Sequence, residues 1–376
     1  MLAASLLCRA VAQPSAAELG VNWTKALDLR LSPLAPQYSV TMSVHDAVEQ
    51  IASHLEALLR HTTGVWELLV AFDACHDASL LVAVSAVTSW ALTERTSHCG
   101  ATLTRVLFLA SDTPAWEAVS DNAVLRRAHP ASSVLLLVQA DVQVTETGWN
   151  EYLALPLRLF DDLVGVSARC AHSYVNRSDA PYEEVCDAFL DKPRPRQQLD
   201  AQRASVVIRD TVNRGPLALR AERMRALNFF DTENFHLGFD EHDLMLRAYA
   251  QHGWKSGRYP VGFTHLFGHG ASSRANRHAG APAAEAALLA ARIARQNRTA
   301  HEELRTALGK RPRWWENRPV SAAQLAAVPT LQASRCTGCV KPPPAGAAPP
   351  AGEEETPAER MCRPDRSLGG SAGRAS

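Results

Sequence analysis

The sequence has no apolar run long enough to cross a membrane and no excess of charge of either sign. The longest apolar runs include SVLLLV and WELLVAF, whereas a membrane helix needs about 20 apolar residues. Lys and Arg together number 39, as do Asp and Glu, so the formal net charge is zero. This balance offers no basic field for nucleic acid and no acidic excess of the kind found in disordered chains. We therefore expect no transmembrane segment in this chain and no nucleic-acid partner.

Two common site signatures are also missing. No G-x-G-x-x-G follows any predicted strand, which argues against a dinucleotide-dependent oxidoreductase on a doubly wound sheet. Cys336-Thr-Gly-Cys339 has the spacing of half a zinc site, but no second Cys or His pair follows it at ligand spacing. The eight cysteines are scattered along 376 residues, a chain too long to need a disulfide framework.

The first 35 residues lack clear periodicity. They include a short apolar stretch and an A-x-A motif, but Arg9 interrupts the stretch and no basic region precedes it. The segment is consistent with a poor secretory signal, a transit peptide or a disordered start. N-glycosylation sequons begin at Asn22, Asn176 and Asn297. These sequons slightly favour the Golgi or secretory lumen over the cytoplasm.

The chain contains ample apolar material for a core, at 46% of its residues, and its length suits one large or two ordinary domains. Apolar, β-branched segments that predict strands alternate with segments of helical periodicity. The predicted strands are Tyr38–His45, Trp66–Phe72, Thr104–Ser111 and Val134–Val138. This alternation predicts an α/β fold, with a mainly parallel central sheet and helices on both faces.

The helix predicted after the first strand illustrates the pattern. Its apolar stripe consists of Val48, Ile51, Leu55 and Leu58, at three- and four-residue spacing. Asp46 is placed to cap this helix, with Glu49 completing a capping box. Later helices are predicted at 78–96, 149–162 and 282–308, and a long polar loop at 172–205.

These patterns divide the chain into four regions. We expect an N-terminal segment at 1–35, an α/β domain at 36–275 and a helical extension at 276–330. From 331 to 376 the sequence is rich in Pro and Ala and cannot bury enough apolar surface to fold, which predicts a disordered tail.

Single acids follow the buried strands of the predicted sheet. Asp73 ends the second strand, Asp77 comes four residues later, and Asp141 follows the fourth strand. In a parallel sheet the carboxyl ends of neighbouring strands face one site, so Asp73 and Asp141 are predicted to share it. Further along, Asp240, Glu241 and Asp243 stand at the start of a helix, where its macrodipole favours negative charge. Helix capping explains one or two of these acids, and Asp243 is a candidate for that role.

Five segments in their order and spacing resemble the family 2 glycosyltransferases. They are YSVTMSVHDAVEQIASHLEALLRHT, WELLVAFDACHDASL, WEAVSDNAVLRRA, VLLLVQADVQVTETGW and LGFDEHDLMLRA. The resemblance covers roughly Tyr38 to Ser273 and implies the GT-A nucleotide-diphospho-sugar transferase fold. It also implies transfer of a sugar from a nucleotide-sugar donor to an acceptor hydroxyl, with inversion at the anomeric carbon and usually with Mn²⁺ or Mg²⁺. We expect the donor to be a UDP-sugar.

The resemblance assigns donor-binding roles to several residues. Asp73 matches the acid that binds the nucleotide base, and Asp77 the acid in the following turn. Asn122 matches the Asn of the family's Asn-x-Gly-x-x-x-Ala helix, although Val124 stands where Gly is usual. Arg214 is a candidate for contact with the diphosphate or the acceptor.

The same resemblance assigns the metal and base positions, although the residue types at these positions differ from those usual in the family. The segment QAD occupies the place of the Asp-x-Asp metal motif, so Asp141 is the expected metal ligand and Gln139 replaces the first acid. A His after the base motif often completes the metal site in this family, and FTHLFGHGASS offers His265 and His269. Asp240 and Glu241 occupy the position of the Glu-Asp pair, one member of which deprotonates the acceptor.

Elementary chemistry supports these assignments. A divalent cation held by one or two carboxylates stabilises the charge that develops on a leaving diphosphate. Inversion needs one carboxylate to accept the proton of the attacking hydroxyl, for which we favour Glu241, with Asp240 as the alternative. The leading hypothesis is therefore a metal-assisted inverting glycosyltransferase that acts on a glycan, protein or lipid acceptor. The alternative is a catalytically silent relative that binds a nucleotide sugar or a glycan.

Overall fold

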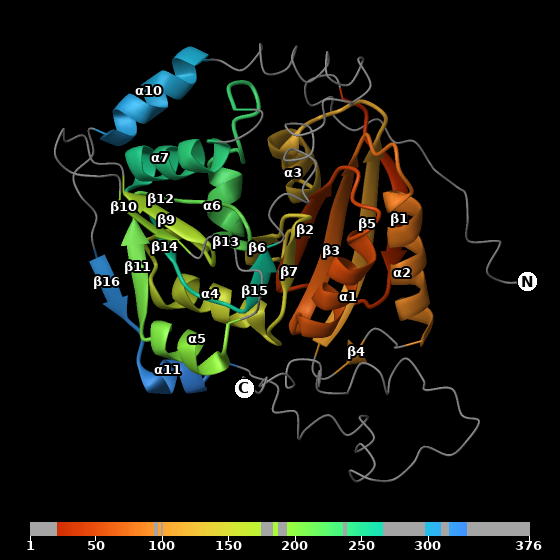
Figure 1. Cartoon of the computed structure of the whole chain (residues 1–376), viewed down its shortest axis with the longest axis horizontal. Helices are drawn as coiled ribbons and strands as arrows, with labels where there is room; N and C mark the ends of the chain where they lie inside the picture. The colour runs from red at the N-terminus through yellow and green to blue at the C-terminus, as the bar shows by residue number, and fades with distance from the viewer. Residues whose placement is uncertain are drawn as a thin grey trace, which may run out of the picture.

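A computed structural model of the chain shows a large central sheet flanked by helices. It describes residues 21–93, 97–98, 101–173, 183–186, 194–235, 239–265, 298–309 and 316–328. The sheet has the strand order β1-β5-β3-β2-β6-β13-β8-β14-β11-β16, with β4 paired to β5. Figure 1 shows this sheet running from β1 on one side of the molecule to β16 on the other.

The first half of the sheet contains the four strands predicted from the sequence. They are β2 (Tyr38–Val44), β3 (Gly64–Asp73), β5 (Ala101–Ser111) and β6 (Val134–Leu137). The pairs β5·β3, β3·β2 and β2·β6 are parallel. The edge is formed by β1 (Thr24–Arg30) and β4 (Ser97–His98), both antiparallel to β5.

The second half of the sheet begins with a reversal of direction. Here β13 (Leu217–Arg220) is antiparallel to both β6 and β8 (Leu163–Ser167). Next, β14 (Lys255–Arg258) runs parallel to β8, and β11 (Ser205–Arg209) and β16 (Glu316–Pro319) complete the edge. Seven strands thus share one direction, namely β5, β3, β2, β6, β8, β14 and β16, so the predicted mainly parallel sheet is confirmed.

Helices cover both faces because the residues of β3 alternate between two cores. Leu68, Val70 and Phe72 pack with α1 (Ile51–His61), α2 (Ser79–Thr93) and α4 (Trp149–Leu159). Leu69 and Ala71 point to the opposite face and pack with α3 (Glu117–Leu125). On that opposite face, farther along the sheet, lie α6 (Ala221–Ala226) and α7 (Asp240–His252). The predicted α/β class with helices on both faces is therefore confirmed.

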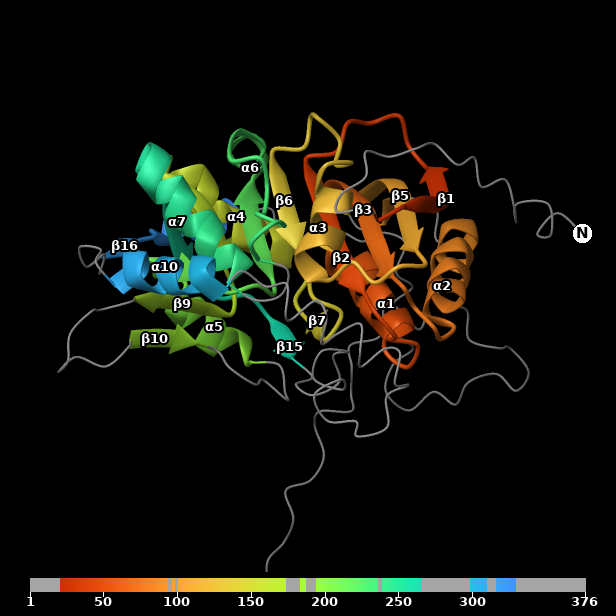
Figure 2. The ribbon, with the colours of Figure 1, turned by 90° about the horizontal axis from the view of Figure 1, so that it is seen from above.

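Two small sheets lie beside the main one. One has the order β10-β9-β12, with β9 at Cys170–Ser173, β10 at Glu183–Cys186 and β12 at Thr211–Val212. The other pairs β7 (Val142–Val144) with β15 (Phe263–His265) near the middle of the molecule, as both views show (Figure 1 and Figure 2). The remaining helices are α5 (Arg196–Gln202), α10 (Arg298–Gly309) and α11 (Ala322–Ala326).

Several boundaries differ from the sequence prediction. Residues 24–30 of the predicted N-terminal segment form β1, and residues 316–319 of the predicted helical extension form β16, so both segments add strands to the main sheet. The predicted loop at 172–205 contains β10 and α5. Within the described ranges, no helix is long and apolar enough to span a membrane. The predicted tail at 331–376 lies outside the described residues.

The first helix begins later than its predicted capping box. It starts at Ile51, and Asp46 has a left-handed backbone with φ of 44°. The Asp46 carboxylate accepts hydrogen bonds from the backbone N–H groups of His76 and Asp77, so the capping prediction was wrong. Ile51 is buried as predicted, whereas Val48 is 36% exposed.

Candidate functional site

The predicted acids and Arg214 lie near one edge of the sheet. Asp73 is the last residue of β3, which ends level with β5. Asp141 comes between β6 and β7. Arg214 precedes β13, whose first residue, Leu217, lies opposite Leu137 at the end of β6. The ends of the parallel strands and the start of the antiparallel strand β13 thus place these side chains at the carboxyl edge, where α/β sheets bind their ligands.

The carboxylate of Asp73 organises the chain that leads into α3. Its Oδ1 accepts a hydrogen bond from the backbone N–H of Ala115 at 2.5 Å, and its Oδ2 accepts one from Trp116 at 2.8 Å. Trp116 has a positive φ of 71°, an uncommon conformation that these two bonds help to hold. Asp73 is 7% exposed. Contact with a nucleotide base stays a prediction for this residue.

Asp77 has a similar role in the turn between β3 and α2. It accepts hydrogen bonds from the backbone N–H of Ser79 at 2.9 Å and of Val48 at 3.0 Å. The first of these satisfies a donor at the start of α2, and the second ties the β2–α1 loop to the same turn. Asp77 therefore shapes the loop in which the resemblance places the donor.

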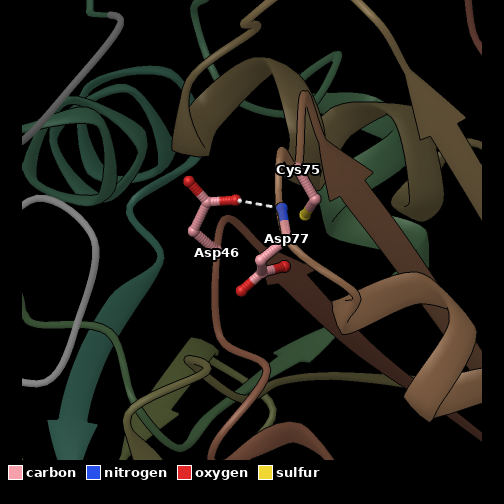
Figure 3. Close-up of side chains that lie close together, drawn as sticks. All are labelled: Asp46, Cys75 and Asp77. Atoms are coloured by element: carbon pink, nitrogen blue, oxygen red, sulfur yellow. Dashed lines mark hydrogen bonds between the residues drawn. The ribbon is translucent and has the colours of Figure 1, made fainter. Parts of the chain in front are cut away.

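Asp77 also belongs to a group of three possible metal ligands. The ligand atoms of Asp46, Cys75 and Asp77 lie within 4.8 Å of one another (Figure 3). Figure 3 shows the hydrogen bond from the Asp77 backbone N–H to the Asp46 carboxylate, at 3.3 Å. The Cys75 thiol donates to the Val44 carbonyl at 3.4 Å, and burial raises its pKa to about 12. The Cys75 contact and the hydrogen bonds to Asp46 tie the β3–α2 turn to the end of β2 and the residues that follow it.

Both ends of the Asn122 amide are bound to one distant residue. Its Nδ2 donates to the Phe230 carbonyl at 2.9 Å, and its Oδ1 accepts from the Phe230 N–H at 3.1 Å. Asn122 is completely buried. These bonds join α3 to the segment that follows α6, which is a structural role. The donor-binding role that the resemblance assigns to Asn122 stays a prediction.

Asp141 and His265 face each other across two short strands. His265 lies opposite Val142 in the β15–β7 pair, one position from Asp141. Its Nε2 is 3.6 Å from Oδ2 of Asp141, and the two side chains are 3% and 17% exposed, respectively. Oδ1 of Asp141 is buried and has no hydrogen-bond partner among the described residues. A carboxylate oxygen with unused lone pairs beside an imidazole suits a divalent cation, Mn²⁺ better than Mg²⁺.

Two further observations bear on the predicted metal site. His54 of α1 is 1% exposed, and its burial lowers its pKa despite the opposing influence of the Ala140 backbone and the Asp141 charge. This places His54 beside the Asp141 loop, a position that sequence reasoning missed because His54 sits on a helix among apolar residues. His269 lies outside the described residues, so its predicted ligand role stays a prediction.

Gln139 is held in place through its amide nitrogen. Its Nε2 donates a hydrogen bond to Oε1 of Glu117 at 2.9 Å. Gly215 packs against it so closely that a Cβ on Gly215 would lie 2.6 Å from Oε1 of Gln139. The amide thus links the end of β6 to α3. The amide oxygen Oε1 is buried and has no hydrogen-bond partner among the described residues.

Arg214 is buried among four carboxylates, and we call these five residues the Arg214 cluster. It contacts Asp121 and Asp240 directly, and its Nη1 is 3.4 Å from Oε1 of Glu117. Its Nε is 3.8 Å from Oε2 of Glu241. The acids come from the start of α3 and the start of α7, so Arg214 joins these two helices. The predicted site residues Arg214, Asp240 and Glu241 are therefore together.

Within the cluster, Asp240 and Glu241 have different surroundings. The Asp240 side chain is 1% exposed and engaged by Arg214, whereas Glu241 is 11% exposed and farther from the guanidinium. Asp243 forms a helix ion pair with Arg247 at 2.7 Å, which confirms that it has a structural contact. Burial raises the pKa of Asp121 to about 6, outweighing the opposite effect of Arg214.

Sequence reasoning missed Glu117 and Asp121. They lie four residues apart and therefore on one face of α3, a spacing that was visible in WEAVSDNAVLRRA. Nothing in the local sequence indicated that Arg214, about 100 residues away, would be their partner.

Comparison with known proteins finds solved structures with a similar fold but no matching sequence family. No family model matches the chain, and no curated protein sequence matches it. The S. aureus TarS fragment 1–349 aligns with 64% of this chain and 62% of its own length, at 12% identity and a TM-score of 0.40. The alignment thus spans less than two thirds of that chain.

Two other solved structures are similar to the same degree. The TarS fragment in complex with UDP covers 60% of this chain and 59% of its own, at 13% identity and a TM-score of 0.38. A mannosyltransferase from Pyrobaculum calidifontis, in complex with GDP-Man and Mn²⁺, covers 78% and 75%, at 18% identity and a TM-score of 0.41. With TM-scores below 0.5, these similarities leave the function to be inferred from the site residues.

Proposed function

We propose that the protein is an inverting glycosyltransferase that moves a sugar from a nucleotide-diphosphate sugar, with a UDP-sugar as the first donor to test, to an acceptor hydroxyl. The observation that carries the proposal is the pairing of Asp141 with His265 near the carboxyl edge of the sheet that also bears Arg214. Through the Arg214 cluster, the acids of α7 join the same region.

Asp141 and His265 are the residues that would hold the cation. The buried Oδ1 of Asp141 has no partner in the described part of the chain, and the imidazole of His265 adds a nitrogen ligand. When bound there, Mn²⁺ or Mg²⁺ would offset the negative charge of the departing nucleoside diphosphate. Because the protein supplies one carboxylate rather than two, we expect the cation to bind mainly together with the donor diphosphate.

Glu241 is the proposed general base. It would accept the proton of the acceptor hydroxyl while the hydroxyl oxygen forms its bond to the anomeric carbon and the nucleoside diphosphate leaves. Asp240 is less suited to this role, because its carboxylate is engaged by Arg214 and is 1% exposed. Glu241 keeps more exposure, at 11%, and is therefore more accessible to an acceptor.

Binding of UDP with Mn²⁺ provides the first test. At a ligand concentration of 100 times Kd the folded state gains about 2.7 kcal/mol, which is readily seen as a rise in Tm. We expect Asp141→Ala to abolish this rise. Asp161→Ala is the matched control, because the Asp161 side chain is 98% exposed and lies outside the site. An unchanged rise in Asp141→Ala would remove this residue from the metal site.

The alternative function is a silent relative that binds a nucleotide sugar or glycan without turnover. It is motivated by Gln139, which adds no charge for holding a cation. Such a relative would show the same thermal shift, but no donor in a nucleotide-sugar panel would be hydrolysed or transferred.

We further propose that the protein resides in the oxidising lumen of the secretory pathway. Cys170 is disulfide-bonded, and the residue opposite it in the β9–β10 register is Cys186. Disulfides persist mainly in oxidising compartments. Peptide mapping without reduction, on protein from its native cells, should find Cys170 in a disulfide. A free thiol at Cys170 would contradict this location.

A further inference from the structure

The Arg214 cluster has an uneven charge balance. One guanidinium faces four carboxylates, and the cluster is largely buried, with Arg214 itself 5% exposed. Buried carboxylates without a nearby cation bind protons rather than stay ionised. Burial raises the pKa of Asp121 to about 6 even though Asp121 contacts Arg214. The four acids therefore share the positive charge of one guanidinium.

We propose that Arg214 is a positioning residue for Glu241: it fixes the start of α7 through Asp240 and places a positive charge 3.8 Å from the carboxylate that accepts the proton. This inference rests on the proposed glycosyl transfer. It adds a second role for Arg214, whose guanidinium contacts protein carboxylates. The predicted contact with the diphosphate or the acceptor stays a prediction.

The groups that face Glu241 come from several elements. On α7 itself, Nε2 of His242 is 4.0 Å from Oε1 of Glu241, while Nδ1 of His242 contacts the Thr211 hydroxyl at 2.7 Å. His172 on β9 stacks edge-on against His242 at 5.5 Å. Burial lowers the pKa of both imidazoles, so both are neutral at pH 7. Among the described residues, Arg214 brings a positive charge to Glu241, with its Nε 3.8 Å from Oε2 of Glu241.

The acids of α3 compete with Glu241 for the same guanidinium. Glu117 is 3.4 Å from Arg214 and 25% exposed, and it also accepts the hydrogen bond from Gln139. Asp121 contacts Arg214 directly. Because each of these acids adds negative charge near Glu241, removing one should have the opposite effect to removing the guanidinium. Opposite effects of the two kinds of substitution would indicate that Arg214 acts through its charge and not only through its structural contacts.

The test is the pH dependence of donor turnover by the full chain, measured for the wild type, Arg214→Met, Arg214→Lys and Glu117→Gln. In Arg214→Met the carboxylate loses its cation, so the acid limb of the profile should move up by about 1–3 pH units. In Glu117→Gln it should move down. Arg214→Lys keeps the positive charge but loses the planar guanidinium that contacts several carboxylates at once. We therefore expect kcat to fall about tenfold or more, with the KM for the donor nearly unchanged.

The matched control is Arg203→Lys. Arg203 is also a buried arginine bound by two carboxylates, Glu146 and Asp200, but it contacts neither acid of α7 in the described chain. It should lose stability without moving the acid limb. If Arg214→Met does not fold, the downward shift in Glu117→Gln and the kcat loss in Arg214→Lys still test the inference.

Each outcome has a distinct meaning. Wild-type turnover with an acid limb that stays fixed in Arg214→Met and Glu117→Gln would overturn the role of Arg214 and leave the proposed function intact. A proportional rise in donor KM in Arg214→Lys would instead assign Arg214 to donor binding and overturn the inference. Absence of turnover in the wild type across the donor panel would overturn the proposed function, and the inference with it.

Discussion

Replacing Asn122 by Ala should destabilise the protein without a specific loss of nucleotide binding. The amide of Asn122 makes two hydrogen bonds to Phe230, at 2.9 Å and 3.1 Å, from a fully buried position. Alanine leaves both the N–H and the carbonyl of Phe230 without this partner. A buried polar group left unsatisfied costs about 1–3 kcal/mol, so the two together should lower the free energy of unfolding by about 2–6 kcal/mol.

The structure offers a matched control on the other face of the sheet. Asn150 of α4 bonds Thr63 in the same way, accepting from its N–H at 3.0 Å and donating to its carbonyl at 2.9 Å. Asn150 is also fully buried. Asn150→Ala should therefore lower stability by a similar amount, although it lies outside the motif that predicts donor binding.

Thermal unfolding with and without UDP and Mn²⁺ distinguishes the two roles of Asn122. For a domain of this size, 1 kcal/mol corresponds to about 2–4 °C, so both variants should melt about 4–24 °C below the wild type. Both should retain the wild-type shift on adding UDP. A normal Tm in Asn122→Ala, combined with loss of the UDP shift in that variant alone, would refute the structural assignment and restore the donor-binding role.

Three further predictions concern single residues. Gly215→Ala should lower the free energy of unfolding in urea by about 1–3 kcal/mol, because Gly215 has φ of 76° and an added Cβ would collide with Gln139. Wild-type stability in this variant would contradict the prediction. Cys75 should react with a thiol reagent at pH 8 far more slowly than a free cysteine, because burial raises its pKa to about 12; rapid labelling of the folded protein would disprove it. Burial lowers the pKa of His172 to about 4, so its contribution to stability is full above pH 6.5 and is lost as the pH falls towards 4. His172→Gln should flatten that part of the stability profile, and an unchanged slope would rule out this source.

The parts of the fold that the sequence predicted are those fixed by local pattern. The strand Tyr38–Val44 and the helix at Trp149–Leu159 were visible because apolar residues recur with the period of each element. The strands at Thr24–Arg30 and Glu316–Pro319 were missed because they lie on or near the edges of the sheet and have few buried residues. Their place is set by partners far along the chain, which no local pattern records.

The candidate site also contains residues that the sequence predicted and contacts that it did not. The position of Asp141 after a buried strand followed from the alternation of elements, and its neighbour His265 from the resemblance. The contacts of Asn122 and Arg214 did not follow, because their partners are separated by about 100 residues and depend on how the helices pack on the sheet. The capping role predicted for Asp46 failed because its carboxylate found backbone donors in the neighbouring β3–α2 turn instead.

The most direct test of the account is nucleotide-sugar turnover by the wild type, Glu241→Gln and Asp240→Asn, with Mn²⁺ and a panel of donors. Glu241 is the more exposed of the two acids, and Asp240 is engaged by Arg214. We expect turnover of at least one donor by the wild type and a loss of about 10²–10⁴-fold in Glu241→Gln, the range typical of a general base. Wild-type turnover that survives unchanged in Glu241→Gln would contradict the proposed base, and binding of UDP without any turnover would contradict the proposed enzyme.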